Sequence, residues 1–233
     1  MQEFFLTIIV PAFNEEEHLK TSVDEVRKAL EQIEINFEII IVDDCSTDNT
    51  FSIAQNLSQR NPHVKVLQNP KNLGLGGTYR TGLSVASGTH VTWVPADESH
   101  PARGLLPTYK AIGTADIIIP RVTNPEIRGR RRRLISRCYT TLVNFLSGLH
   151  MPYYNGLSVH RVDLLKNISL QSNGFGFQAE AIVKLIYQKA SFITTDATIY
   201  ERPSGESKAF TLRNIMSVAS VLLYILWLRM RRN

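Results

Sequence analysis

The stretch LTIIVPAFNEEE, residues 6–17, decides the fold class. Its first five residues form a short apolar run, which is typical of a strand buried in a parallel sheet. The apolar residues after the acids recur every three or four positions, as on one face of a helix: Leu19, Val23, Val26, Leu30 and Ile33. We expect Asn14 to cap this helix and Glu15 to Glu17 to fill its first turn, where the helix dipole favours negative charge.

The same alternation of strand and helix continues along the chain. Further strands are predicted at residues 37–42, 64–68, 89–94 and 115–120. Further helices are predicted from Ser46 or Thr47, over residues 78–86 and from Pro101. The second half is less regular, with helices at 127–149 and 178–190, a turn and strand at 151–161, and a strand at 191–201. The order predicts an α/β fold whose mainly parallel sheet is flanked by helices, with ligands at the carboxyl ends of the strands.

The loop after the first strand argues against binding of NAD or FAD. Those cofactors need a glycine turn there, so that backbone N–H groups can approach the pyrophosphate. Residues 11–17 contain no glycine and three acids, and the glycine-rich NLGLGG at 72–77 follows the third strand instead. Carboxylates suit another arrangement, in which they accept hydrogen bonds from base and ribose while a divalent cation neutralises the diphosphate. Asp43 and Asp44 are then candidates for base and ribose contacts, and Asp97 for the metal ligand, although each taken singly also suits a turn at a strand end.

Four segments carry a resemblance to a known family. They are TIIVPAFNEE (7–16), EIIIVDDCSTDNT (38–50), NLGLGGTYRTGL (72–83) and PADESHP (95–101). Together they resemble the family 2 glycosyltransferases, which have the GT-A fold. FGFQAEAIVKL (175–185) and ERPSGESK (201–208) are similar to late motifs of the dolichyl- and polyprenyl-phosphate sugar (mannose) synthases. The resemblance covers residues 6 to 210.

The resemblance implies a set of site residues. Those of the nucleotide-sugar pocket would be Pro11, Phe13, Asn14, Glu15, Val42, Asp43, Asp44, Ala96, Asp97, Arg121, Arg202 and Lys208. Asp97, Arg121 and Arg202 would be the catalytic residues, and Asp97 with Ser99 would hold Mg²⁺ or Mn²⁺. Arginine forks match phosphate oxygens, which suits Arg121 and Arg202.

Two positions depart from the family's pattern. The family usually has Asp-x-Asp where this chain has Pro95-Ala96-Asp97, so the first acid is absent. The stretch YYNGLSVHR, residues 153–161, replaces the family's usual Thr-Ser-Gly-Phe-Arg type of sequence. The first departure bears on metal affinity and the second on the sugar or the acceptor.

The resemblance implies an inverting transfer of a sugar from a nucleotide-sugar donor to a polyprenyl phosphate. A lipid phosphate is already ionised at pH 7, whereas a hydroxyl acceptor would need a general base, for which Glu98, His100 and Glu180 are the candidates. Two alternatives stay open: a family 2 transferase with a hydroxyl acceptor on a polysaccharide or glycolipid, and a non-catalytic nucleotide-sugar binding protein. The sugar and the nucleotide (GDP, UDP or dTDP) are not specified.

Charge and hydropathy bear on partners and location. The net charge is +5, from 26 basic and 21 acidic residues, and arginines gather in RGRRRR (128–133) and in the tail. No nucleic-acid motif accompanies them, so we expect no nucleic acid and favour an anionic membrane surface. Two cysteines without motif spacing and no visible signal peptide favour a reducing compartment, hence a peripheral protein on the cytoplasmic face of a membrane.

The C-terminal segment differs from the rest of the chain. We expect a glycosyltransferase domain at residues 1–210, followed by an apolar helix with a basic tail at 211–233. The apolar run 214–228 has fifteen residues, about 22 Å of helix, which is short for a ~30 Å hydrocarbon core. It suits the membrane interface, or else packing in the core or a dimer. A membrane-anchoring partner subunit and a homodimer both remain open.

Overall fold

The structure is a computed structural model that describes residues 5–97, 102–200 and 212–232, with the backbone alone for 212–215. Its strands are β1 (Phe5–Ala12), β2 (Asn36–Asp43), β3 (Val64–Gln68), β4 (His90–Trp93), β5 (Ile117–Val122), β6 (Val159–Arg161) and β7 (Phe192–Ala197). Its α-helices are α1 (Leu19–Glu31), α2 (Thr50–Arg60), α3 (Gly74–Val85), α4 (Leu106–Lys110), α5 (Arg130–Ser147), α6 (Val162–Lys166), α7 (Phe177–Tyr187) and α8 (Leu212–Arg232). Two 3₁₀ turns, η1 (Ala102–Leu105) and η2 (Pro125–Ile127), precede α4 and α5.

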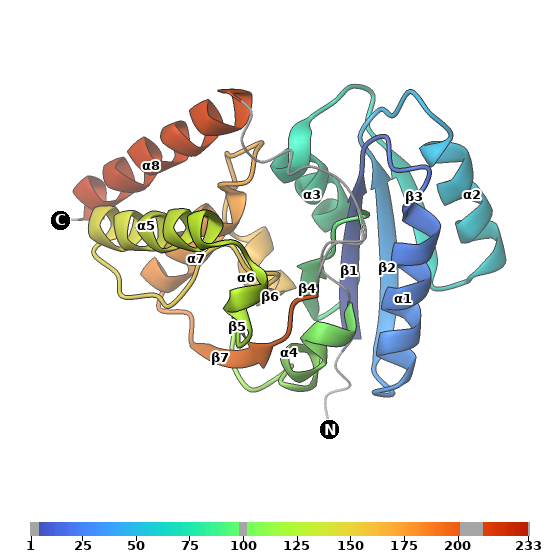
Figure 1. The fold of residues 1–233 in the computed structure, drawn as a ribbon, viewed down its shortest axis with the longest axis horizontal. Helices are drawn as coiled ribbons and strands as arrows, with labels where there is room; N and C mark the ends of the chain where they lie inside the picture. The colour runs from blue at the N-terminus through green and yellow to red at the C-terminus, as the bar shows by residue number, and fades with distance from the viewer. Residues whose placement is uncertain (1–4, 98–101, 201–211, 233) are drawn as a thin grey trace.

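Within the described residues the strands form a seven-stranded sheet in the order β3-β2-β1-β4-β6-β5-β7. All neighbouring strands are parallel except β6, which runs antiparallel between β4 and β5. Helices cover both faces, and α5 and α8 pack side by side at the end of the molecule opposite α2 (Figure 1). This arrangement confirms the predicted mainly parallel α/β fold.

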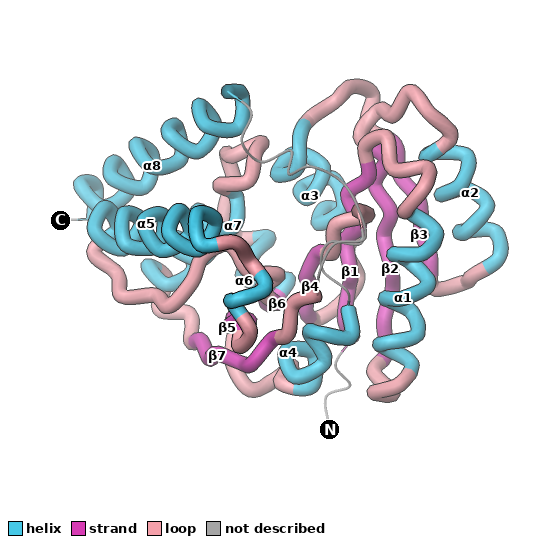
Figure 2. Tube along the Cα trace, viewed as in Figure 1, coloured by secondary structure: helices cyan, strands magenta, loops and turns pink. Residues whose placement is uncertain are grey.

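The core follows from the sequence pattern. The central strands are apolar runs that helices bury on both sides, and residues 39–42 of β2 are fully buried. Because β1, β2 and β3 are parallel, the loops that follow them gather at one edge of the sheet (Figure 2). The acidic segments after β1 and β2 are therefore neighbours in space.

The predicted start of α1 is wrong. The helix begins at Leu19, its first turn has no acid, and no side chain caps it. Asn14 has a left-handed backbone with φ of 54°, and its side-chain oxygen accepts a hydrogen bond from the Thr47 amide at 2.9 Å. The same bond explains why α2 begins at Thr50 and not at Ser46 or Thr47, since the two loops bind each other before either helix starts.

Other element ends also differ from the prediction. α3 begins at Gly74, inside the glycine-rich turn, and the short helices α4 and α6 have too few residues for a visible period. α5 ends where Gly148 adopts a left-handed φ of 69°. The predicted helix start at Pro101 lies outside the described residues.

Candidate active site

The ends of β1 and β2 form one edge of the site. Pro11 pairs with Val42 and Ala12 with Asp43, and the Asp44 amide donates to the Ala12 carbonyl at 2.8 Å. Beyond the strands, the Asn14 amide donates to Ser46 Oγ at 3.0 Å and the Glu15 amide donates to Thr50 Oγ1 at 2.8 Å. The two acidic loops are thus held together by direct hydrogen bonds.

Asp43 is a buried acid with free acceptor capacity. Its side chain is 0% exposed, and its Oδ2 accepts hydrogen bonds from the Ser46 amide at 3.2 Å and Gln68 Nε2 at 3.0 Å. Its Oδ1 has no hydrogen-bond partner among the described residues. A buried acceptor without a partner is costly, so this oxygen is suited to a donor group supplied by a ligand.

Asp44, by contrast, has protein partners on both of its carboxylate oxygens. Its Oδ1 accepts from Asn69 Nδ2 at 2.7 Å and from the Leu73 amide at 2.8 Å, and its Oδ2 accepts from the Gly74 amide at 2.9 Å. The sequence pattern makes this acid a candidate for a ribose contact or for a turn at the strand end. The structure shows that it also fixes the start of the glycine-rich turn.

The other predicted residues of this edge differ in exposure. Phe13 is exposed and Glu15 half-buried, so their side chains can meet a ligand. Pro11 is half-buried, whereas Val42 is fully buried and can offer only its backbone.

The end of β4 brings Asp97 to the same edge. The Val94 amide donates to the Ile9 carbonyl at 2.9 Å, which continues the pairing with β1 beyond the strand. Ala96 is buried, and its carbonyl accepts from Ser22 Oγ at 2.9 Å. Asp97 follows in a half-buried turn, whereas its predicted partner Ser99 lies outside the described residues.

The metal expectation can be tested against the chemistry of these groups. No group of three or more His, Cys, Asp or Glu side chains that could hold a metal occurs within the described ranges. A single carboxylate nevertheless fits Mg²⁺ or Mn²⁺ of the kind that keeps several waters and binds substrate phosphates. Asp97 therefore fits a cation that arrives with a diphosphate, and does not fit a cage made of protein ligands alone.

Of the three predicted phosphate-binding cations, the structure describes Arg121 alone. Arg121 sits in β5, largely exposed, and pairs with Asp196 of β7 at 2.9 Å. Arg202 and Lys208 lie outside the described residues. Of the candidate bases, Glu98 and His100 also lie outside them, whereas Glu180 is described and is 0% exposed.

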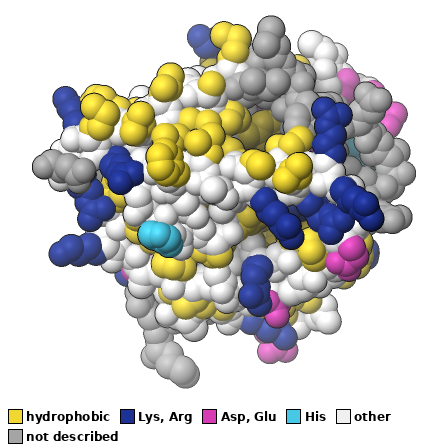
Figure 3. Space-filling view, turned by 60° about the vertical axis from the view of Figure 1, so that its left-hand side comes forward, with side chains coloured by type: hydrophobic (Ala, Val, Ile, Leu, Met, Phe, Trp, Pro, Cys, Tyr) yellow, Lys and Arg dark blue, Asp and Glu magenta, His cyan; other side chains and the backbone are white. Residues whose placement is uncertain are grey.

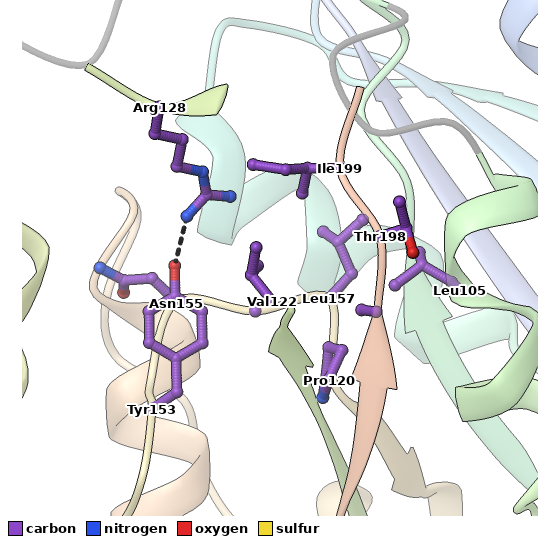
Figure 4. Close-up of a pocket in the computed structure, with 11 residues that line it drawn as sticks. Leu105, Pro120, Val122, Arg128, Tyr153, Asn155, Leu157, Thr198 and Ile199 are labelled. Carbon is purple, nitrogen blue, oxygen red and sulfur yellow. Dashed lines mark hydrogen bonds between the residues drawn. The ribbon is translucent and has the colours of Figure 1, made fainter. Parts of the chain in front are cut away.

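A small cavity of about 30 Å³ lies where β5 and β7 end, and its walls are mainly apolar (Figure 4). Pro120, Leu157 and Ile199 are among them. Arg128 lies above the cavity and donates from a guanidinium nitrogen to the Tyr153 hydroxyl at 3.2 Å (Figure 4). The sequence does not single out either residue, although both lie in stretches with a predicted role: RGRRRR toward a lipid phosphate or an anionic leaflet, and the departure YYNG toward the sugar or the acceptor.

The neighbour of Tyr153 has a structural role instead. Tyr154 is fully buried, and its hydroxyl donates to Asn144 Oδ1 of α5 at 2.8 Å. Asn144 also bonds both backbone groups of Met151 at 2.9 Å. The loop that carries Tyr153 is therefore fixed to α5.

The fold is an α/β fold of the GT-A type, and its acids gather at the carboxyl ends of the strands. The model of glycosyl transferase family 2 matches residues 7–168. The chain therefore belongs to glycosyl transferase family 2.

Curated relatives include undecaprenyl-phosphate mannosyltransferase of Micrococcus luteus, 29% identical over 86% of this chain and 85% of that protein. Polyprenol monophosphomannose synthase of Mycolicibacterium smegmatis is 30% identical over 86% of this chain and 79% of its own length. Dolichol-phosphate mannosyltransferase of Pyrococcus furiosus is 28% identical, and the alignment spans 87% of this chain but 58% of that longer protein. The resemblance to polyprenyl-phosphate sugar synthases is thus confirmed.

Solved structures show the same fold at lower identity. Glucosyl-3-phosphoglycerate synthase of Mycobacterium tuberculosis with Mn²⁺, UDP-glucose and phosphoglyceric acid has a TM-score of 0.71 and 15% identity, over 96% of this chain and 80% of that one. Mannosyl-3-phosphoglycerate synthase of Rubrobacter xylanophilus has a TM-score of 0.70 and 19% identity, over 98% of this chain and 74% of that one. These likenesses support the fold.

Proposed function

We propose that this protein transfers a sugar from a nucleotide-sugar donor to a polyprenyl phosphate at a membrane surface. The observation that carries the proposal is the division of the sheet edge. Acids lie over the ends of β1, β2 and β4, whereas an apolar cavity with an arginine and a tyrosine above it lies over β5 and β7. The relatives named for polyprenyl-phosphate mannosyl transfer favour the same donor and acceptor classes.

The donor would occupy the acidic half. Asp43 Oδ1 would accept a hydrogen bond from a base N–H group, because it is a buried acceptor with no partner among the described residues. Phe13 and Glu15 would flank the nucleoside, and Asp44 would face its ribose. Asp97 would hold a divalent cation that neutralises charge on the diphosphate.

The acceptor would occupy the apolar half. The cavity itself has room for little more than a water, so a phosphate would meet the two donors Arg128 and Tyr153 at its mouth, with the first prenyl carbons against apolar side chains beside it such as Ile199. One phosphate oxygen would attack the anomeric carbon while the bond from that carbon to the nucleoside diphosphate breaks. Direct displacement inverts the anomeric centre, and the ionised phosphate needs no base.

The outer faces of α5 and α8 suit the membrane surface. Each carries a stripe of exposed apolar side chains, namely Leu134, Leu142 and Phe145 on α5, and Met216, Leu223, Trp227 and Met230 on α8. Arginines flank both stripes, at 130–133 and 229–232, and Figure 3 shows apolar side chains beside Lys and Arg on this side of the molecule. Among the described helices none is long and apolar enough to cross a bilayer. We infer peripheral binding at an anionic, cytoplasmic leaflet.

The test is a donor panel of UDP, GDP and dTDP sugars with polyprenyl phosphate as the sole acceptor, with and without Mg²⁺ or Mn²⁺. Transfer to the lipid phosphate from at least one donor supports the proposal. Transfer only to a hydroxyl acceptor would favour the polysaccharide or glycolipid alternative, and donor binding without turnover would favour a binding protein.

Flotation with vesicles tests the proposed membrane surface on α5 and α8. Vesicle binding that grows with anionic lipid and falls in Phe145→Asp supports this surface, whereas a dimer in solution that covers the same face contradicts it.

A further inference from the structure

Glu180 on α7 is a fully buried carboxylate, and both of its oxygens accept hydrogen bonds from the protein. Oε1 accepts from the Gln171 amide at 2.8 Å and from Lys184 Nζ at 2.7 Å, and Oε2 accepts from the Ser172 amide at 2.8 Å. A carboxylate in this position is 0% exposed and cannot reach a substrate proton. It is therefore unsuited to act as a general base, and it holds the loop of residues 171–173.

This loop in turn holds the glycine-rich turn. The Asn173 carbonyl accepts from the Gly76 amide at 2.8 Å. Arg80 of α3 donates to the Ser172 carbonyl at 2.7 Å and to the Asn173 side chain. A Cβ on Gly76 would lie 2.2 Å from the Ser172 carbonyl oxygen, so the two backbones meet at a distance that only glycine permits.

The glycine-rich turn leads back to the nucleotide edge. Its Leu73 and Gly74 amides donate to the two oxygens of Asp44, at 2.8 and 2.9 Å. The links from Glu180 to Asp44 thus run through the loop 171–173 and the turn 72–77, and a backbone amide is the donor at each step.

We propose that Glu180 is a positioning residue for donor binding, acting through the loop 171–173 and the turn 72–77 on Asp44. The inference rests on the proposed function and deepens it, because it gives α7 an indirect role in donor binding although α7 does not contact the donor site. A glutamine at this position has one acceptor oxygen for two backbone donors, so the loop and the turn behind it loosen.

The experiment compares Glu180→Gln with the exposed control Glu34→Gln. In Glu180→Gln the donor KM rises about 10-fold, kcat stays within about 2-fold and the acid limb of the kcat profile keeps its midpoint. A general base would instead lower kcat by about 10² or more at an unchanged KM and remove the acid limb. A fall in Tm with an unchanged donor KM, measured well below Tm, would also overturn the proposal.

Two further readouts complete the test. Amide hydrogen exchange at residues 72–77 becomes faster in Glu180→Gln and not in Glu34→Gln, and unchanged exchange would overturn the link. This readout needs no substrate, so it stays decisive even if the wild-type protein transfers no sugar and the proposed function fails.

Arg80→Gln acts on the same loop. Its effect on the donor KM should therefore combine with that of Glu180→Gln less than additively, and full additivity contradicts the proposal.

Discussion

Strand β2 carries a buried acid at each end, and the two are treated differently. At the amino end, Glu38 accepts from Thr7 Oγ1, the Ser87 amide and Lys65 Nζ, each at 2.7 Å. At the carboxyl end, Asp43 keeps one oxygen without a partner among the described residues. The amino end is complete without a ligand, whereas the carboxyl end keeps a buried acceptor that the proposed donor would fill.

The difference also shows in protonation. Desolvation alone would raise the pKa of Glu38, but hydrogen bonds from Lys65, Thr7 and Ser87 lower it to about 2. The contribution of Glu38 to stability is therefore present above pH 4.5 and is lost as the pH falls toward 2. One end of the strand contributes stability, and the proposed role of the other is binding.

The largest expected effect lies at the carboxyl edge. Asp97→Asn should lower turnover by about 10³-fold, because the charge that holds the cation is lost, and should leave Tm within about 2 °C. Initial rates at saturating donor, with added Mg²⁺ and with chelator, measure this. Turnover that survives both the substitution and chelation contradicts a metal role for Asp97.

The middle of the sheet gives the next effect. His160 on β6 is fully buried, neither ring nitrogen has a partner among the described residues, and burial lowers its pKa from 6.5 to about 4. The unfolded chain binds a proton that the folded chain does not, so the free energy of unfolding falls by about 3 kcal/mol as the pH drops from above 6.5 to below 4. His90, whose pKa is lowered by burial and by the Arg161 charge, adds in the same direction.

Denaturant unfolding between pH 7 and 4.5 checks this, in a window above the Glu38 effect. His160→Leu should remove more than half of the change in unfolding free energy with pH. The control His150→Gln, in the loop after α5, should leave that change as it is in the wild-type protein. An unchanged slope in His160→Leu would show that another group titrates.

The amino end comes third. Glu38→Gln leaves buried backbone and hydroxyl donors short of an acceptor, at a cost of about 2 kcal/mol and a Tm lower by roughly 4–8 °C. The donor Kd should not change, because the substitution lies at the end of the sheet away from the site. Calorimetry and titration of the same samples measure both, and a weakened donor Kd would break the proposed separation of the two ends.

The sequence could predict the strands and the position of the candidate site better than the contacts that hold the site together. Apolar runs such as 39–42 identify the strands, and the acids after them indicate where the candidate site lies, because strand period and strand direction are local properties. Nothing local shows that Asp44 binds the turn 72–77, that Glu180 binds a loop, or that Arg128 meets Tyr153, because these contacts join segments far apart in the chain. The start of α1 was missed for the same reason, since Asn14 bonds Thr47 and not its own helix.

The fourth effect tests Asp43 directly. Asp43→Asn should raise the donor Kd about 10-fold, because an amide replaces a charged acceptor that faces a base N–H group. Tm should shift less than in Glu38→Gln, which serves as the matched control from the other end of β2. An equal donor Kd in Asp43→Asn and the wild-type protein would remove Asp43 from the base pocket.

The smallest effect concerns the exposed pair of Arg121 and Asp196, whose side chains are 65% and 63% exposed. Solvent screens such a pair, so Asp196→Asn should change the free energy of unfolding by less than about 0.5 kcal/mol. If Arg121 binds a substrate phosphate, Asp196 competes for the same guanidinium, and Asp196→Asn should lower the KM of donor or acceptor about 2-fold, most clearly at low salt. Steady-state kinetics at two ionic strengths measure this change, and a raised KM would mean that Asp196 orients Arg121 and does not compete with phosphate.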